Sequence, residues 1–144
     1  MNEKIRNIRF FFLGFSLLAI FVLAPPMKDS LEKSEATVSS ARQLLTRFDV
    51  EYALANGQVI KETIKSSQIV PGDINKAGLL QIQGTNEKLN VWHKNGKVWQ
   101  IQKQNGEFLL KFEDIQKRRY IFLFALIGAL VFGAVFLPKL VKKP

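Results

Sequence analysis

Cysteine is absent from this chain of 144 residues, and histidine occurs once, at His93. Without cysteine the protein forms no disulfide and has neither a thiolate metal ligand nor a cysteine nucleophile. A hydrolytic metal centre usually needs several His, Asp or Glu ligands, and none cluster in sequence around His93. We therefore expect no bound metal and no cofactor.

Sequence motifs that are typical of a particular enzymatic reaction are also absent. There is no glycine-rich phosphate loop, and Ser39 and Ser40 lack the surroundings of a nucleophile elbow. Asp49 and Glu51 alternate along a strand-like segment and are explained by its polar face. His93 precedes a turn and is predicted to be a solvated surface histidine. An enzyme that uses Asp49, Glu51 or His93 is accordingly the weakest hypothesis.

The most prominent features of the sequence are two long apolar runs without a charged residue. Residues 120–138 form the first, 19 residues with basic residues on both sides, and residues 10–27 form the second. A hydrocarbon core of about 30 Å needs about 20 apolar helical residues. We predict transmembrane helices at 10–24, where Pro25 and Pro26 end the first helix, and at 120–138.

The N-terminal run also has the basic and apolar regions of a secretory signal. Pro25 and Pro26 would directly follow the cleavage site, where they should fit a peptidase badly. We interpret the run as an uncleaved anchor, which leaves residues 1–9 and 139–144 as short tails and 25–119 as one domain between the spans.

The formal charge of +9 lies mainly beside these runs. Residues 25–116 carry 12 basic and 11 acidic side chains, a net charge of +1. A nucleic-acid-binding face would need its basic residues on the folded domain, so no nucleic-acid partner is predicted. Lys117, Arg118 and Arg119, just before the second span, are predicted to contact lipid headgroups.

Orientation rests on a small difference in flanking charge. Three basic residues precede the first span and two follow it, and the first span usually dominates. We expect both termini in the cytoplasm and the central domain in the periplasm or outside the cell. The predicted location is a bacterial inner (plasma) membrane.

The central segment is predicted to be a small α+β domain that holds one amphipathic helix and an antiparallel meander of five or six strands. Leu31, Val38 and Ala41 fall near helical steps, which favours a helix over 28–48, although a strand around Val38 is the alternative. Residues 66–78 resemble a loop. Alternation from Phe48 onward then predicts the strands. These cover 48–54, 58–64, 79–83, 89–93, 98–102 and 108–112.

Asn-Gly pairs follow three of these segments, at Asn56-Gly57, Asn95-Gly96 and Asn105-Gly106. Such pairs favour type I′ turns, which need positive φ at both central residues, and we predict a type I′ turn at Asn56-Gly57. Three of them at hairpin positions are a specific signal for antiparallel pairing.

Two groups of residues are candidates for contacts with other molecules. Ala125, Ala129 and Gly133 recur at every fourth residue, a spacing that lets another helix approach closely. That helix is either the first span, through Gly14, Ser16 and Ala19, or a partner's helix. Trp92 and Trp99 flank the Asn95-Gly96 turn; packing is their default role, and a peptide, glycan or lipid site is the alternative.

These observations favour a non-catalytic integral membrane subunit or scaffold. Its spans would pack against a larger membrane complex or a second copy, and its β-rich domain would lie outside the membrane. Neither span has an ionisable interior residue, which argues against a transporter or channel acting alone. A binding or sensing module that uses the Trp92 and Trp99 region is the alternative, and an enzyme is a distant third.

Overall fold

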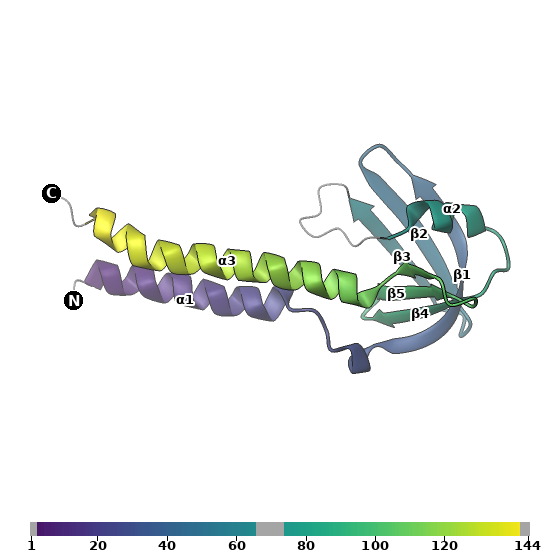
Figure 1. Cartoon of the computed structure of the whole chain (residues 1–144), viewed down its shortest axis with the longest axis horizontal. Helices are drawn as coiled ribbons and strands as arrows, with labels where there is room; N and C mark the ends of the chain where they lie inside the picture. The colour runs from purple at the N-terminus through teal and green to yellow at the C-terminus, as the bar shows by residue number, and fades with distance from the viewer. Residues whose placement is uncertain (1–2, 66–73, 142–144) are drawn as a thin grey trace. The chain divides into compact units, whose positions relative to one another are not determined.

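The computed structural model describes residues 3–65 and 74–141, in which three α-helices accompany one six-stranded antiparallel sheet. The chain divides into two compact units (Figure 1). One contains α1 (Glu3–Leu23) and most of α3 (Phe112–Val141). The other, Pro26–Gln116, contains the sheet, α2 (Lys76–Ile82), a 3-10 turn (Lys28–Ser30) and the first turn of α3.

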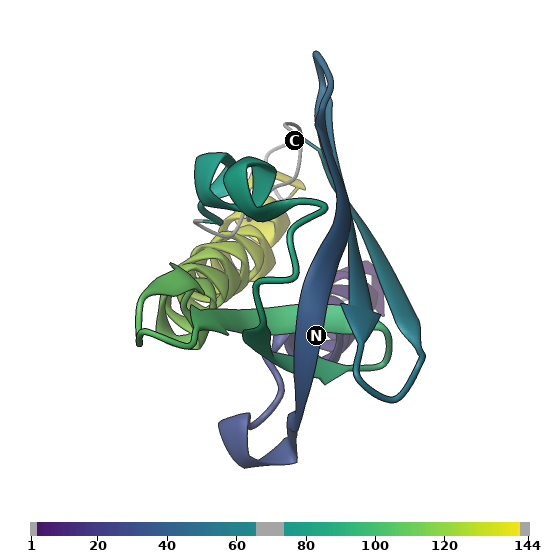
Figure 2. The same cartoon turned by 90° about the vertical axis from the view of Figure 1, so that its right-hand side faces the viewer.

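The sheet has the strand order β3-β2-β1-β4-β5-β6 and consists of two three-stranded meanders joined through β1 and β4. The strands are β1 (Glu32–Gln43), β2 (Arg47–Leu54), β3 (Val59–Lys65), β4 (Leu89–Lys94), β5 (Lys97–Lys103) and β6 (Phe108–Leu110). Residues 32–36 of β1 pair with β4, and residues 36–43 pair with β2. This long central strand therefore organises both halves of the sheet (Figure 2).

The predicted helix over 28–48 is wrong, because most of that segment is β1. Ala36, Val38 and Ala41 are buried on one face, with a register shift between Val38 and Ser40 that keeps Ala41 on that face. The strand gains hydrogen-bonding neighbours on both sides, which local helix propensity cannot offset. The alternative of a strand around Val38 is confirmed.

A helix replaces the predicted strand at 79–83. The Asn75 side chain caps α2 by accepting a hydrogen bond from the Gly78 N–H at 2.9 Å. Leu79 and Ile82, one turn apart, are buried against the sheet. Of the predicted loop 66–78, residues 66–73 lie outside the described residues, and the last three belong to α2.

The hairpins are confirmed, and their turns differ. Asn95 and Gly96 both have positive φ, 51° and 72°, as a type I′ turn requires. At Asn56-Gly57 only the glycine does, at 85°, so the predicted type I′ turn there is wrong. The Asn56 side chain instead accepts the Gln58 N–H at 3.0 Å, and Asn105 accepts the Glu107 N–H similarly.

One face of the sheet, α2 and the first turn of α3 enclose the core. Its largest fully buried side chains include Tyr52, Phe48, Phe112 and Leu79. The predicted strand 108–112 ends at Leu110, and Phe112 begins α3. The chain therefore passes from the core of the domain directly into a long apolar helix.

Candidate functional site

The two long helices expose most of their apolar surface. Ile5–Leu23 and Phe112–Phe136 are long and apolar enough to cross a membrane, yet only 11% and 6% of the tested window is buried. A core helix of a soluble protein would be mostly buried. Phe21 and Phe124, exposed by 88% and 70%, illustrate how much apolar area these helices present to their surroundings.

Each helix has one less exposed face. In α1, Ile5 and Ala19 are buried, and the half-buried residues Ile8, Phe12 and Leu23 continue their three- and four-residue spacing. In α3 the buried Leu123 belongs to a similar face. Because α1 and most of α3 form one compact unit, these faces are where the helices cover one another.

The predicted small-residue interface mostly lies outside that covered face. Ala125 and Ala129 are exposed, and Gly133 is half-buried. Gly128 lies beside them, and a Cβ atom built on it would meet no heavy atom within 4 Å. Of the first-span residues considered as its counterpart, Ala19 is buried, whereas Gly14 is exposed. Two of the three predicted interface residues, Ala125 and Ala129, are therefore not covered by the described part of the chain.

Trp92 and Trp99 occupy different environments. Trp99, 6% exposed, belongs to the core and packs edge-on against Phe112 with ring centroids 6.3 Å apart. Trp92 is half-buried, alternates with the buried residues of β4, and has the Lys33 ammonium 5.1 Å from its ring centroid. Of the two indoles, only that of Trp92 is therefore accessible enough to contact another molecule.

The basic residues before the second predicted span lie in α3. Lys117 is exposed, and Arg118 and Arg119 are half-buried. Nearby, Lys28 forms an ion pair with Glu113 and lowers the pKa of that carboxyl mainly through its hydrogen bond. This pair joins the segment that leaves α1 to the start of α3, so the two connections of the domain meet at one place.

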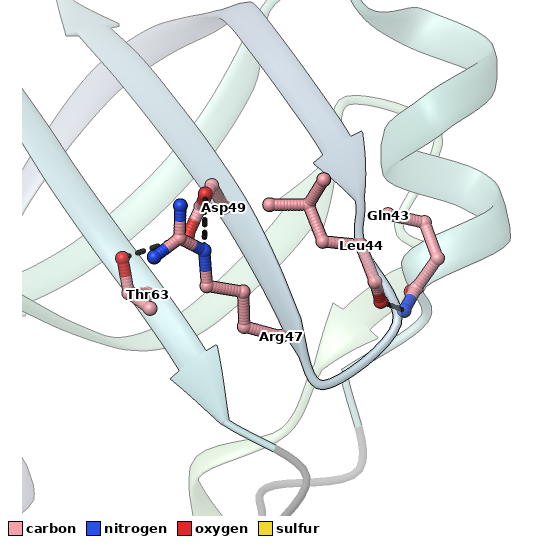
Figure 3. Close-up of polar contacts among 5 residues, drawn as sticks. All are labelled: Gln43, Leu44, Arg47, Asp49 and Thr63. Atoms are coloured by element: carbon pink, nitrogen blue, oxygen red, sulfur yellow. Dashed lines mark hydrogen bonds and ion pairs between the residues drawn. The ribbon is translucent and has the colours of Figure 1, made fainter.

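The three candidate catalytic residues do not converge. Asp49 is held by Arg47 (Nε to Oδ2, 3.1 Å) and by the Thr63 hydroxyl (2.8 Å), as Figure 3 shows, and Glu51 pairs with Lys61 at 2.8 Å. Both carboxylates alternate with the buried residues of β2.

His93 shares the buried side of β4 with Leu89 and Val91, and its Nε2 lies 3.0 Å from the Ser34 hydroxyl. The prediction of a solvated surface histidine is wrong. Burial follows from alternation along β4, since every second residue of that strand faces the core.

Sequence reasoning missed Glu62, a carboxylate on the core-facing side of β3. It accepts a hydrogen bond from the Val98 N–H of β5 at 2.8 Å. Desolvation by burial raises its pKa to about 7, although this hydrogen bond and Lys97 act in the opposite direction. Glu62 lies two residues from both Ile60 and Ile64, and this period of two in the sequence could have indicated that its side chain faces the core.

Tyr52 is the buried neighbour of Glu62. It is fully buried, and its hydroxyl has no hydrogen-bond partner among the described residues. Burial raises its pKa, and the charge of Glu62 raises it further. Tyr52 and Glu62 therefore form an electrostatically coupled pair on the core side of β2 and β3.

Comparisons with known proteins give no further assignment: no family model, curated protein or solved structure matches the chain. Within residues 3–65 and 74–141, no group of three or more His, Asp or Glu side chains is arranged to hold a metal ion. The function must therefore be inferred from the exposed surfaces.

Proposed function

We propose that this protein is a non-catalytic integral membrane subunit or scaffold. Residues 10–24 and 120–138 span the membrane, and the α+β domain lies outside it. The observation that carries the proposal is the pair of long apolar helices whose surfaces are almost entirely unburied. Lipid removes such surfaces from water and leaves the backbone hydrogen bonds of a helix intact.

The same proposal places the protein in a bacterial inner membrane with both termini in the cytoplasm and the domain in the periplasm. The Lys28–Glu113 ion pair supports a hairpin arrangement, because it holds together the two connections between the domain and the spans. Arg9 at one boundary and Lys117, Arg118 and Arg119 at the other would contact lipid headgroups.

Membrane extraction tests the anchoring directly. We expect the full-length protein to sediment with membranes, to resist alkaline carbonate washing, and to require detergent for release. Carbonate removes peripheral proteins, whereas a helix surrounded by acyl chains stays inserted. A full-length protein that is soluble and monomeric in buffer without detergent would overturn the proposal.

The stripe of Ala125, Ala129 and Gly133, with the exposed Gly128 beside it, is the proposed contact with a helix of a larger membrane complex or of a second copy. Close approach of two backbones depends on small side chains, because packing drives helix association in lipid. We expect Ala129→Leu to reduce copurification of the wild-type partner about tenfold in mild detergent, measured by quantitative mass spectrometry.

Val131→Leu is the matched control, since Val131 is also exposed on α3 and the change also adds bulk. It should retain the partner. Equal retention by Ala129→Leu and by the control would exclude the stripe as the contact, and equal loss would show only a general sensitivity of α3.

A binding or sensing module is the second candidate, favoured by Trp92. Its indole is half-buried beside Lys33, in a position where a peptide, glycan or lipid chain can displace the lysine. Binding that is lost in Trp92→Ala and kept in a variant of the exposed Val59 would support this role.

A further inference from the structure

The tip of the β1–β2 hairpin, residues 43–47, exposes two adjacent leucines. Leu45 is completely exposed, and Leu44 is 40% exposed. Figure 2 shows the hairpin of β1 and β2 reaching beyond the other strands. A single exposed leucine is ordinary, but two neighbours at the end of a projecting hairpin place apolar area where the domain itself cannot cover it.

The tip is fixed by hydrogen bonds rather than loosely tethered. The Leu44 N–H donates to the Arg47 carbonyl at 2.8 Å, and the Gln43 side-chain amide donates to the Leu44 carbonyl at 2.8 Å. Figure 3 shows how Gln43 closes one side of the turn while Arg47 lies along Asp49 on the other. Binding through the leucines therefore requires little further ordering of the backbone.

Positive charge surrounds this apolar tip. Arg42 is the last residue but one of β1, and Arg47 begins β2 and pairs in register with Lys65. The Lys76 ammonium lies 5.9 Å from the Phe48 ring centroid. Asp49 is the acidic residue held among them. Four basic residues and one carboxylate therefore lie around the tip, whereas the domain segment as a whole has a net charge of only +1.

Exposed leucines surrounded by arginine and lysine suit the interface of an anionic bilayer. The apolar side chains enter the boundary between headgroups and acyl chains, and the cations lie against lipid phosphates. An acidic protein partner would satisfy the charges, but the outermost side chain, Leu45, is completely exposed, and Leu44 is the only other exposed large apolar residue that the described part of the tip, residues 43–47, offers to a shared protein core.

We propose that the β1–β2 tip docks on an anionic phospholipid surface, with Leu44 and Leu45 inserted at the headgroup level and Arg42, Arg47 and Lys65 against the phosphates. The proposal goes beyond anchoring by the helices and rests on the proposed function only in that the helices bring the domain to the bilayer. It adds a third lipid contact, made by the domain itself.

The absence of cysteine allows a direct test with single environment-sensitive labels on the full-length protein. Thr46→Cys places a label beside both leucines, and Ala55→Cys places one at the opposite end of β2. Val131→Cys reports on the second span. The proteins are reconstituted into vesicles of phosphatidylcholine with or without phosphatidylglycerol, and quenching by lipids brominated on the acyl chains is measured.

We expect lipid quenching at position 46 to exceed that at 55 about threefold in anionic vesicles, and to fall when phosphatidylglycerol is omitted or salt is raised. Leu45→Ser should abolish the quenching at position 46. Val59→Ser, a change of another exposed apolar residue beyond the opposite turn, should leave it unchanged. Leu45 has no buried contacts to lose, so these variants should fold.

The outcomes separate the two proposals. Quenching at 131 but not at 46 would overturn the lipid-docking tip, favour a protein contact there, and leave the anchoring intact. Quenching at 46 but not at 131 would support the tip and contradict the spans. Quenching at neither position would overturn both, and equal quenching at 46 and 55 would show that the tip has no special contact.

Discussion

Glu62→Gln is expected to stabilise the domain at pH 8 by about 2–3 kcal/mol. The folded domain raises the pKa of this carboxyl from about 4.5 to about 7, mainly by desolvation. Each pKa unit corresponds to about 1.4 kcal/mol, and the remaining exposure of the side chain to water reduces the full value somewhat. The glutamine oxygen can still accept the Val98 N–H, so the substitution removes the ionisation cost and keeps the bridge to β5.

The direction of the pH dependence follows from the raised pKa. Between pH 4.5 and 7 the folded state holds a proton on Glu62 that the unfolded state has released. The contribution of Glu62 to the free energy of unfolding should therefore be greatest below pH 4.5. It should fall as the pH rises to about 7 and stay constant above that pH. Glu62→Gln should flatten this decline.

Urea unfolding of the full-length protein in detergent micelles measures the effect. Both tryptophans, Trp92 and Trp99, lie in the sheet, so their fluorescence reports on this domain. Glu51→Gln is the matched control, since Glu51 pairs with Lys61 on the exposed side of β2 and should change stability by less than about 1 kcal/mol. A less stable Glu62→Gln at pH 8 would contradict the assignment of an ionisation cost.

Trp99→Ala should cost about 3–5 kcal/mol of unfolding free energy, as truncation of a large core side chain typically does. Trp99 packs on Phe112, and the Lys97 ammonium lies 4.9 Å from its ring centroid. Loss of the indole would leave a cavity between β5 and the start of α3. The midpoint of urea unfolding, followed through Trp92 fluorescence, should fall sharply.

Trp92→Ala provides the comparison. Its side chain is half-buried beside Lys33, so its removal should cost only about 1 kcal/mol. Equal effects of the two substitutions would contradict the different environments described for them. The difference also affects how ligand assays are interpreted, because lost binding in Trp99→Ala would reflect unfolding and only Trp92→Ala tests recognition.

Local patterns predicted the parts of the chain whose structure depends on nearby residues. The uncharged runs correspond to long helices, α1 ends at Leu23 just before Pro25, and each Asn-Gly pair lies in a hairpin. A run of apolar residues forms a helix because it satisfies its own backbone, and a tight turn depends on a residue that tolerates positive φ. These features need no information about distant contacts.

Tertiary structure decided what local patterns left ambiguous. Residues 32–43 became a strand because β2 and β4 hydrogen-bond to both edges, and 76–82 became a helix because it covers the core. The burial of His93 and the bridge from Glu62 to Val98 likewise depend on strands far apart in sequence. Strand pairing and burial are long-range interactions. The sequence by itself therefore determined the two long apolar helices and the positions of the hairpins, whereas the sheet determined which side chains are buried, which bridge two strands and which are exposed at the hairpin tip.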